Sequence, residues 1–394
     1  MPRIVLLGGD TDFNLGDRAI VAALASQLAA MARDLRVSIV GRAASRSALP
    51  AVIDRVIPRG AKGFVELLGE ARRSDGVCVA GGGLFQDDDS RIKMPYWAAR
   101  LSLLRAANPN LAGHAIGAGP LAHVESRAAA RIACANLRSV SVRDDFARRW
   151  LTPCTGHVVP VVPDPAFMLP AASSMRAAEW LRERGLRPGQ PVVGMALRRW
   201  FHRRGGFVPH KVRHTLRLDG GAGAVDLDVL LEDVAAAVRP LLGQLDAALL
   251  LLPTYDVGHE GDGAACARFA QLLPDVPVHL GLIEDPTLYK AVTGQLRLMV
   301  SARMHPLILA AGMGVPIVGL AYNGKFEGLF DILGIPRRLL WLEEFRDGGQ
   351  AGRLRELMMS ALTDGDAIGR HADALAERSR QATRALLEVL EVAA

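Results

Sequence analysis

The stretch 301–330 combines side chains that can bind an anion and move a proton. Arg303 and His305 stand two residues apart before an apolar run with helical periodicity, and Lys325 follows the next predicted strand. Arginine keeps its positive charge at physiological pH, whereas histidine exchanges a proton near neutrality. The pair therefore predicts an anion clamp beside a general acid or base. Taken alone, His305 fits a helix-capping or core histidine nearly as well.

Two glycine-rich loops follow predicted strands earlier in the chain. The first is GGDTDFNLGD at 8–17, which leads into a helix, and the second is AGGGLFQDDD at 80–89. Glycines at a strand end let backbone N–H groups approach an anion, and the helix dipole adds to the attraction. The first loop is also compatible with a plain strand-to-helix turn in which Asp17 caps the helix or lies near its first turn.

Three consecutive aspartates occupy positions 87–89 and raise the question of a divalent metal site of DxD type. Carboxylates are frequent at turns, and the sequence shows no partner ligands for a metal. A solvated acidic loop is the preferred interpretation, and we predict no metal.

A strongly basic segment spans 198–217, with seven arginines and lysines and three histidines. Guanidinium groups bind phosphate and carboxylate through paired hydrogen bonds, so the segment predicts a loop over an anionic substrate. An ordinary solvated loop remains an alternative. A nucleic-acid patch, with Trp200 and Phe201 stacking on bases, is a weaker one because no known module surrounds them.

The composition is typical of a two-domain α/β protein. The chain has 394 residues, of which 50% are hydrophobic and only 5% aromatic, and its net charge is +6. Small residues let helices pack closely on buried parallel sheets, and the positive charge permits anionic ligands without choosing among them. The four scattered cysteines lack metal or CxxC spacing, which fits a reducing cytosol. No apolar run approaches the roughly 18 residues that span a bilayer.

Alternating apolar runs and periodic stretches predict strands and helices in turn. In the first half, strands are expected at 3–9, 36–40, 76–80, 112–116, 139–142 and 157–162, and helices at 16–35 and 126–136. In the second half, strands are expected at 191–198, 247–253, 276–281, 296–302 and 315–322, and helices at 226–242, 264–273 and 366–391. The pattern predicts two Rossmann-like doubly wound domains, 1–170 and 171–394, facing a cleft, with the last helix packing back on the first domain.

The four loops, in this order, resemble the polysaccharide pyruvyl transferase family. The elements that match it before the second half are FNLGDRAI (13–20), GGGLFQD (81–87), GAGP (117–120), SVRD (141–144) and PDPAF (163–167). The most diagnostic elements are Ser301, Arg303, His305, the GVP at 314–316, Tyr322 and Lys325. The resemblance covers about residues 4–335, and its specificity lies in the joint order and spacing of these elements.

The resemblance implies a GT-B-like fold, a phosphoenolpyruvate donor and a sugar acceptor. It implies that Arg303 and His305 hold and protonate the donor, with Arg198 as a second grip, or Arg199 if the register shifts by one. We place Lys325 near the phosphate. Asp12 and Asp17 are candidates for orienting or deprotonating acceptor hydroxyls. The other expected substrate-binding residues are Asn14, Gly16, Gly82, Gly83 and Tyr322.

The acceptor is the least transferable part of the resemblance. The opening GGDTD is more acidic than the family pattern, and the basic insertion at 203–217 is not a family signature. We expect a role in making a cell-surface polysaccharide or glycoconjugate, with an acceptor that is free, lipid-linked or nucleotide-linked. No cofactor besides the co-substrate phosphoenolpyruvate and no nucleic acid is expected. The expected location is the cytoplasm, including the inner face of the membrane, and a homo-oligomer is left open.

Two other classes of protein remain as alternatives. A GT-B nucleotide-sugar glycosyltransferase would bind a diphosphate at the second-domain glycines and helix N-terminus, with Glu327 as the one acidic candidate for holding a ribose. A non-catalytic polyanion-binding protein would instead use the basic segment at 198–217, and its binding would be sensitive to salt.

Overall fold

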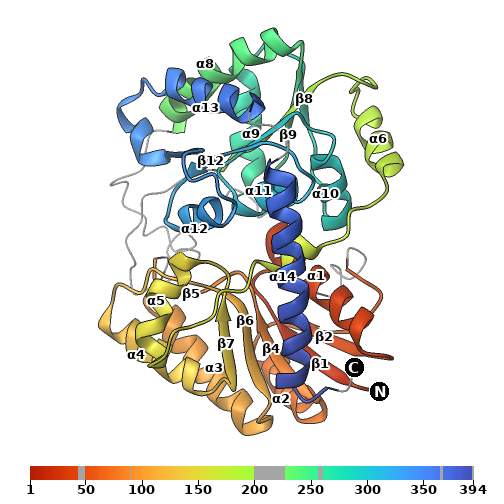
Figure 1. The fold of residues 1–394 in the computed structure, drawn as a ribbon, viewed down its shortest axis with the longest axis vertical. Coiled ribbons are helices and arrows are strands. Elements are labelled where there is room, and N and C mark those ends of the chain that lie inside the picture. The colour runs from red at the N-terminus through yellow and green to blue at the C-terminus, as the bar shows by residue number, and fades with distance from the viewer. Residues whose placement is uncertain (43–48, 89, 199–226, 256–260, 364–366, 393–394) are drawn as a thin grey trace.

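The computed structural model describes residues 1–42, 49–88, 90–198, 227–255, 261–363 and 367–392. Two sheets stand one above the other in Figure 1, and helices flank each of them. All strand pairs are parallel, which confirms the predicted α/β class. The central strands are buried on both faces, because helices cover the two sides of each sheet.

The first sheet has the strand order β3-β2-β1-β4-β6-β5, and β7 pairs with β6. Its strands are β1 (Arg3–Leu7), β2 (Arg36–Val40), β3 (Ile53–Ile57), β4 (Gly76–Ala80), β5 (Gly83–Phe85), β6 (Leu111–Ala118) and β7 (Ser139–Val142). Its helices are α1 (Leu15–Met31), α2 (Ala61–Arg73), α3 (Lys93–Ala107), α4 (Val124–Ala135) and α5 (Asp145–Thr155). The strand order reverses between β1 and β4, so a ligand crevice is expected at their carboxyl ends.

The second sheet has the order β10-β9-β8-β11-β12-β13 and reverses between β8 and β11. Its strands are β8 (Val192–Ala196), β9 (Ala248–Leu251), β10 (Val278–Leu280), β11 (Leu298–Ser301), β12 (Ile317–Ala321) and β13 (Leu339–Trp341). The helices of this half are α6 (Ser174–Glu183), α8 (Leu227–Leu245), α9 (Asp262–Gln271), α10 (Pro286–Thr293), α11 (Met304–Ala311), α12 (Lys325–Ile332), α13 (Ala351–Thr363) and α14 (Ala367–Val389). Two short 3₁₀ helices, η2 (Pro165–Met168) and η4 (Leu342–Asp347), complete the described elements.

The C-terminal helix α14 runs from the second sheet down to the first (Figure 1). It contacts α1 and η2, and a Cβ added at Gly76 of β4 would come within 2.8 Å of the Leu390 side chain just beyond the helix. The amine of Lys290 in α10 also links the halves, since it donates to the carbonyl oxygens of Phe167 and Leu169 at 3.1 and 2.7 Å. The domain boundary at residue 170 falls between the two sheets and stays a prediction.

Several expected elements were wrong or missing. The strand predicted at 157–162 does not form, and this segment contributes only an isolated bridge between Val142 and Val161. Pro160 and Pro163 lack the N–H groups that a ladder needs, which explains the failure. The sequence also gave no signal for β3, β5 and β13, which are edge strands of three to five residues. Among the described helices, none combines the length and hydrophobicity that a membrane crossing requires.

Candidate active site

A cavity of about 500 Å³ lies between the two halves. Its wall includes the loops after β1, β3, β4 and β7 and part of α3 in the first half, and the loops after β9, β11 and β12 in the second. Both points of strand-order reversal therefore open toward the same space, as the rule for doubly wound sheets expects. The residues expected from sequence that line it are Asn14, Gly16, Asp17, Gly82, Gly83, Arg303, His305, Tyr322 and Lys325.

The imidazole of His305 is held between groups of the first half. His305 is the second residue of α11, its side chain is 13% exposed, and its Nε2 lies 3.7 Å from Oδ2 of Asp164. On the other side the ring packs on the backbone of α1, since a Cβ added at Gly16 would lie 2.0 Å from Nδ1 of His305. Burial opposes ionisation of Asp164, but His305 and Arg143 outweigh it and hold the pKa of this carboxyl below its usual value. The imidazole of His305 therefore lies beside a buried carboxyl group whose ionised form is favoured.

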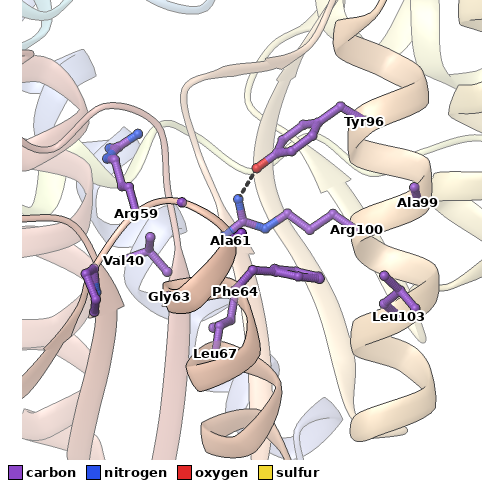
Figure 2. A pocket seen from close by; sticks show the side chains of 12 residues that line it. Val40, Arg59, Ala61, Gly63, Phe64, Leu67, Tyr96, Ala99, Arg100 and Leu103 are labelled. Carbon is purple, nitrogen blue, oxygen red and sulfur yellow. Dashed lines mark hydrogen bonds between the residues drawn. The ribbon is translucent and has the colours of Figure 1, made fainter.

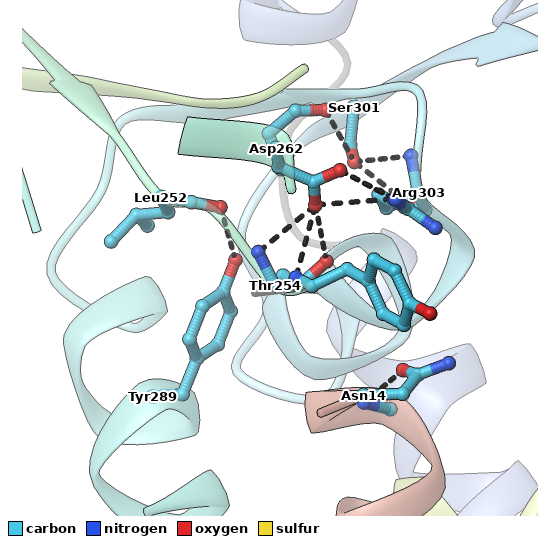
Figure 3. Close-up of polar contacts among 10 residues, drawn as sticks. Asn14, Leu252, Thr254, Asp262, Tyr289, Ser301 and Arg303 are labelled. Atoms are coloured by element: carbon cyan, nitrogen blue, oxygen red, sulfur yellow. Dashed lines mark hydrogen bonds and ion pairs between the residues drawn. The ribbon is translucent and has the colours of Figure 1, made fainter. Parts of the chain in front are cut away.

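The guanidinium of Arg303 is fixed by a buried carboxylate, Asp262. The Nη2 of Arg303 lies 2.5 Å from Oδ1 of Asp262, and its Nε lies 3.2 Å from both carboxylate oxygens (Figure 3). Oδ2 of Asp262 also accepts from the backbone N–H groups of Thr254 and Tyr255, both at 3.1 Å. Burial disfavours the charge on Arg303, yet Asp262 more than compensates and raises its pKa. The side chain remains 19% exposed, so its charge is both permanent and accessible from the cavity.

Neither Arg198 nor Lys325 forms an ion pair with another described residue, although the charge of Asp88 acts on both of them. The guanidinium of Arg198 lies 4.2 Å from the ring centre of Tyr322, the residue is not among those that line the cavity, and its buried Nε has no hydrogen-bond partner in the described structure. Burial, and then repulsion from Arg303, lower the pKa of Arg198. Lys325 begins α12 and donates to Oε1 of Gln86 across the interface between halves, and burial lowers its pKa. A bound anion would stabilise the charged form of both residues.

Asn14, and not Asp17, caps helix α1, and Asp17 makes a different contact. The first turn of α1 is capped by Asn14, whose Oδ1 accepts from the Gly16 N–H at 2.9 Å, so Asp17 is not the cap but lies in the first turn, the other position that the plain-turn interpretation allowed. Oδ2 of Asp17 instead accepts from the Asp10 N–H at 2.8 Å. Burial raises the pKa of Asp17, with His305 nearby acting in the opposite direction. A carboxyl of raised pKa on the cavity wall is suited to take a proton from a hydroxyl.

Asp12 does not reach the cavity. Its carboxylate accepts from the Arg42 N–H at 2.6 Å and from Nε of Arg59 at 3.0 Å, and its side chain is buried. Asp12 is therefore not among the described residues of the cavity wall, and its role toward acceptor hydroxyls stays a prediction. Arg199 and the rest of the basic segment, 199–217, lie outside the described residues.

The acidic loop after β5 is structural. Asp87 is buried, and its two carboxylate oxygens accept from the N–H groups of Ala122 and His123 at 3.1 and 2.9 Å. The expectation that Asp87 is solvated was wrong, because these amides precede α4 and need an acceptor. Asp89 lies outside the described residues. Within the described part of the chain, no group of His, Cys, Asp and Glu side chains has the arrangement of a metal site.

The sequence did not single out four residues that shape the site. Arg143 lines the cavity and pairs with Asp164, with 3.3 Å between Nη1 and Oδ2. Lys93 also lines it and donates to the Gly83 carbonyl oxygen at 2.8 Å. Arg143 and Asp164 stand inside the SVRD and PDPAF motifs, which was a usable signal. Asp262 and Lys93 stand in no motif, because only the folded chain brings Asp262 to Arg303 and Lys93 to the cavity.

The comparisons with known proteins agree with this architecture. Two doubly wound units around a shared cleft define a GT-B-like fold. Residues 14–200 match the model of the polysaccharide pyruvyl transferase family, which confirms the resemblance over that range and supports a transferase. A search of curated protein sequences finds no significant match.

Solved structures with low sequence identity share the fold. UDP-GlcNAc 2-epimerase from Methanocaldococcus jannaschii aligns with a TM-score of 0.61 and 11% identity over 98% of this chain and 100% of that one. A glycosyltransferase from Rickettsia africae gives a TM-score of 0.56 and 9% identity, covering 100% and 99%. ADP-heptose LPS heptosyltransferase II from E. coli gives a TM-score of 0.50 and 14% identity, covering 91% and 98%. At these identities the likeness extends to the fold alone.

Proposed function

We propose that the protein transfers pyruvate from phosphoenolpyruvate to two hydroxyls of a sugar, forming a cyclic ketal. The observation that carries this proposal is the placement of His305. A proton donor stands against a buried carboxylate in a cavity that also contains Arg303, Lys325 and Arg143. Phosphoenolpyruvate needs this combination, since it presents a carboxylate, a phosphate and a methylene carbon that must be protonated. The family match over residues 14–200 supports the same reaction.

The fixed cations would bind the two anionic groups of the donor. Arg303 keeps its orientation through Asp262 before any ligand arrives, so it would contribute without reorganisation during the reaction. Lys325 has no carboxylate partner among the ion pairs of the described residues, and a bound anion would place a negative charge beside its amine. We assign Arg303 and Lys325 to the carboxylate and phosphate as a pair, without choosing which binds which.

The reaction then follows from the positions of the acid and the base. His305 gives a proton to the methylene carbon of phosphoenolpyruvate, and positive charge develops at C2. One sugar hydroxyl adds to C2 and loses its proton to a base, for which Asp17 is the candidate on the wall. The C2–O bond to phosphate breaks, and the second hydroxyl adds to C2. The products are the ketal and inorganic phosphate, which carries the proton of the second hydroxyl, and the proton that Asp17 accepted returns to His305 for the next turnover.

The test separates donor binding from chemistry. Phosphoenolpyruvate binding is measured by calorimetry, and transfer is followed by phosphate release and by mass spectrometry of a panel of saccharides. His305→Asn should reduce transfer by about 10²–10⁴-fold, the usual contribution of a general acid, while binding of phosphoenolpyruvate changes little. Lys325→Met should weaken that binding by about 10–100-fold, since a hydrogen bond to a charged group is lost. Wild-type transfer by His305→Asn would refute the assignment.

A nucleotide-sugar glycosyltransferase is the second candidate, because several proteins that share the fold act on nucleotide sugars by their names. Calorimetry with UDP-GlcNAc provides the discrimination. Binding of UDP-GlcNAc that depends on Lys325, together with no binding of phosphoenolpyruvate, would favour this candidate. Under our proposal, phosphoenolpyruvate binds and the nucleotide sugar does not compete with it.

A further inference from the structure

Three buried side-chain nitrogens of the cavity wall lack a hydrogen-bond partner in the described part of the chain, Nε of Arg100, Nε of Arg143 and Nε2 of His305. Of these side chains, only histidine exchanges a proton near neutral pH. Arg100 also lines a second pocket, of about 420 Å³, where Figure 2 shows it beside Tyr96. The described wall of that pocket contains no histidine and no carboxylate, so proton transfer in the cleft depends on the surroundings of His305.

The two nitrogens of the His305 imidazole have different surroundings. Nε2 is fully buried and lies 3.7 Å from Oδ2 of Asp164. Nδ1 is not fully buried and has no hydrogen bond to another described residue. It lies against the bare backbone of Gly16 at the cavity wall, where an added Cβ would lie 2.0 Å from it. The nitrogen that a ligand in the cavity can reach is therefore Nδ1.

The carboxyl group of Asp164 is fixed from two sides. Its Oδ1 accepts from the Ala166 N–H at 3.0 Å and caps η2, and its Oδ2 lies 3.3 Å from Nη1 of Arg143. Burial opposes its ionisation, but His305 and Arg143 keep its pKa below the usual value. An ionised carboxylate only accepts hydrogen bonds, so the nitrogen that faces it must carry a hydrogen. Such contacts are often long in an unliganded enzyme and shorten when the substrate binds.

We propose that Asp164 is a positioning residue that keeps a hydrogen on Nε2 of His305, so that Nδ1 is the atom that protonates the donor. This inference rests on the proposed function for the reaction, and it adds the atom that transfers the proton and the residue that selects it. The N–H bond at Nδ1 breaks, and the electron pair of the phosphoenolpyruvate double bond forms a C–H bond at the methylene carbon. The imidazole becomes neutral and keeps its hydrogen on Nε2, beside Asp164.

Asp17 is placed to return a proton to the same nitrogen. It follows Gly16 in the first turn of α1 and lines the same cavity. Burial raises the pKa of Asp17 and His305 counteracts this shift, so the charges of the two groups interact. A return of the proton needs the open nitrogen, because Nε2 is buried beside Asp164.

Alkylation by bromoacetate identifies the open nitrogen in the wild-type chain. Bromoacetate carries a carboxylate, as the proposed donor does, and it reacts with a ring nitrogen that has a free lone pair. After digestion, the peptide that contains position 305 is isolated, and its carboxymethyl histidine is compared by chromatography with standards of the two isomers. His305 should yield the Nδ1 product, since its Nε2 carries the hydrogen.

His157 is the internal control for this reaction. Its Nδ1 lies 3.1 Å from the carbonyl oxygen of Thr155 and must donate to it, which leaves Nε2 to react. An Nε2 product at His305, or no product there under conditions that modify His157, would overturn the proposal.

Asp164→Asn tests whether the carboxylate selects the position of the hydrogen. Oδ1 can still accept from the Ala166 N–H, while an amide N–H replaces Oδ2 and donates to Nε2. The hydrogen of neutral His305 should therefore move to Nδ1. Nitrogen-15 NMR of the labelled full chain, above about pH 8, reports this as an exchange of the two ring-nitrogen shifts, and His305→Asn assigns the signal. Transfer should fall by about 10²–10⁴-fold, whereas the affinity for phosphoenolpyruvate should change far less.

Asp144→Asn is the matched control. The side chain of Asp144 is 4% exposed, as is that of Asp164, and its Oδ2 lies 3.4 Å from Nε of Arg143. It also caps a helix, since its Oδ1 accepts from the Ala147 N–H at 2.7 Å. It forms no ion pair with His305 in the described structure, so this variant should keep the wild-type tautomer. The wild-type tautomer in Asp164→Asn, or the same change in both variants, would contradict the proposal. If Asp164→Asn does not fold, the alkylation of the wild type decides.

Failure of the proposed function would give a different pattern, because neither the alkylated atom nor the tautomer depends on phosphoenolpyruvate. If both are as expected and calorimetry detects no binding of phosphoenolpyruvate, the positioning of His305 by Asp164 stands and the donor assignment fails. If phosphoenolpyruvate is bound and turned over but Nε2 is alkylated, the donor assignment stands and this inference fails.

Discussion

The two halves of the molecule line one cavity with different kinds of group. Among the described residues, every glycine on its wall belongs to the first half, at positions 8, 9, 16, 82 and 83. The second half contributes side chains, and Arg303 is fixed there by Asp262. Cations come from both halves, Arg143 and Lys93 from the first and Arg303 and Lys325 from the second. The first half thus offers a backbone that a ligand can approach closely, and the second half offers side chains that are held in place.

Removing the carboxylate that fixes Arg303 should have the largest effect. Asp262→Asn leaves Arg303 without its counter-charge, and breaking a buried ion pair costs about 3–5 kcal/mol in the free energy of unfolding. Urea denaturation measures this loss. Asp228→Asn is the control in the same half, because its pair with Arg268 is exposed and should contribute less than about 1 kcal/mol. Equal losses in the two variants would show that the second half does not depend on this buried pair.

Acid should destabilise the protein through His114 of β6, in the first sheet. Burial lowers the pKa of His114 from 6.5 to about 4. Between these values the unfolded chain binds a proton that the folded chain does not, so the free energy of unfolding falls as pH falls. The loss reaches about 3 kcal/mol at pH 4, at 1.36 kcal/mol for each pKa unit. Denaturation of His114→Asn across this range should show a shallower slope.

The exposed His157 provides the control for this pH dependence. His157→Asn should keep the wild-type slope, because the side chain of His157 is exposed. An unchanged slope in His114→Asn would mean that the first sheet does not contain a histidine buried in its neutral form.

A methyl group added at Gly16, in the first half, should slow the transfer that depends on His305 of the second half. In Gly16→Ala the new Cβ would lie 2.0 Å from Nδ1 of His305, so the imidazole must move. We expect transfer to fall by about 10²-fold, the usual effect of a misplacement near 1 Å, which corresponds to about 2.7 kcal/mol. Phosphate release measures it.

Gly69→Ala in α2 is the matched helix substitution, since no atom lies within 4 Å of its new Cβ. Alanine favours a helix over glycine, so this variant should keep wild-type transfer and gain up to about 1 kcal/mol in stability. Full transfer activity in Gly16→Ala would remove the argument that the first half acts through its bare backbone.

Much of the fold was predictable because strands and helices have different hydrophobic periods. The strands 36–40, 76–80 and 139–142 have the predicted bounds, since buried parallel strands are continuous apolar runs. The edge strands β3 and β13 escaped prediction because a short strand with one partner needs no such run. The order of the site motifs was also visible, and most of their residues lie on one cavity.

The sequence by itself determined two alternating α/β units, the glycine loops at their strand ends, and the presence of Arg303, His305 and Lys325. Only the tertiary structure decided which charges are compensated. Asp262 lies 41 positions before Arg303, and Asp164 approaches His305 from the other half of the molecule. Likewise the unpaired Nε of Arg100 is a property of its surroundings. Local patterns reflect burial along a single element, whereas the electrostatic state of a side chain depends on neighbours that any part of the chain can supply.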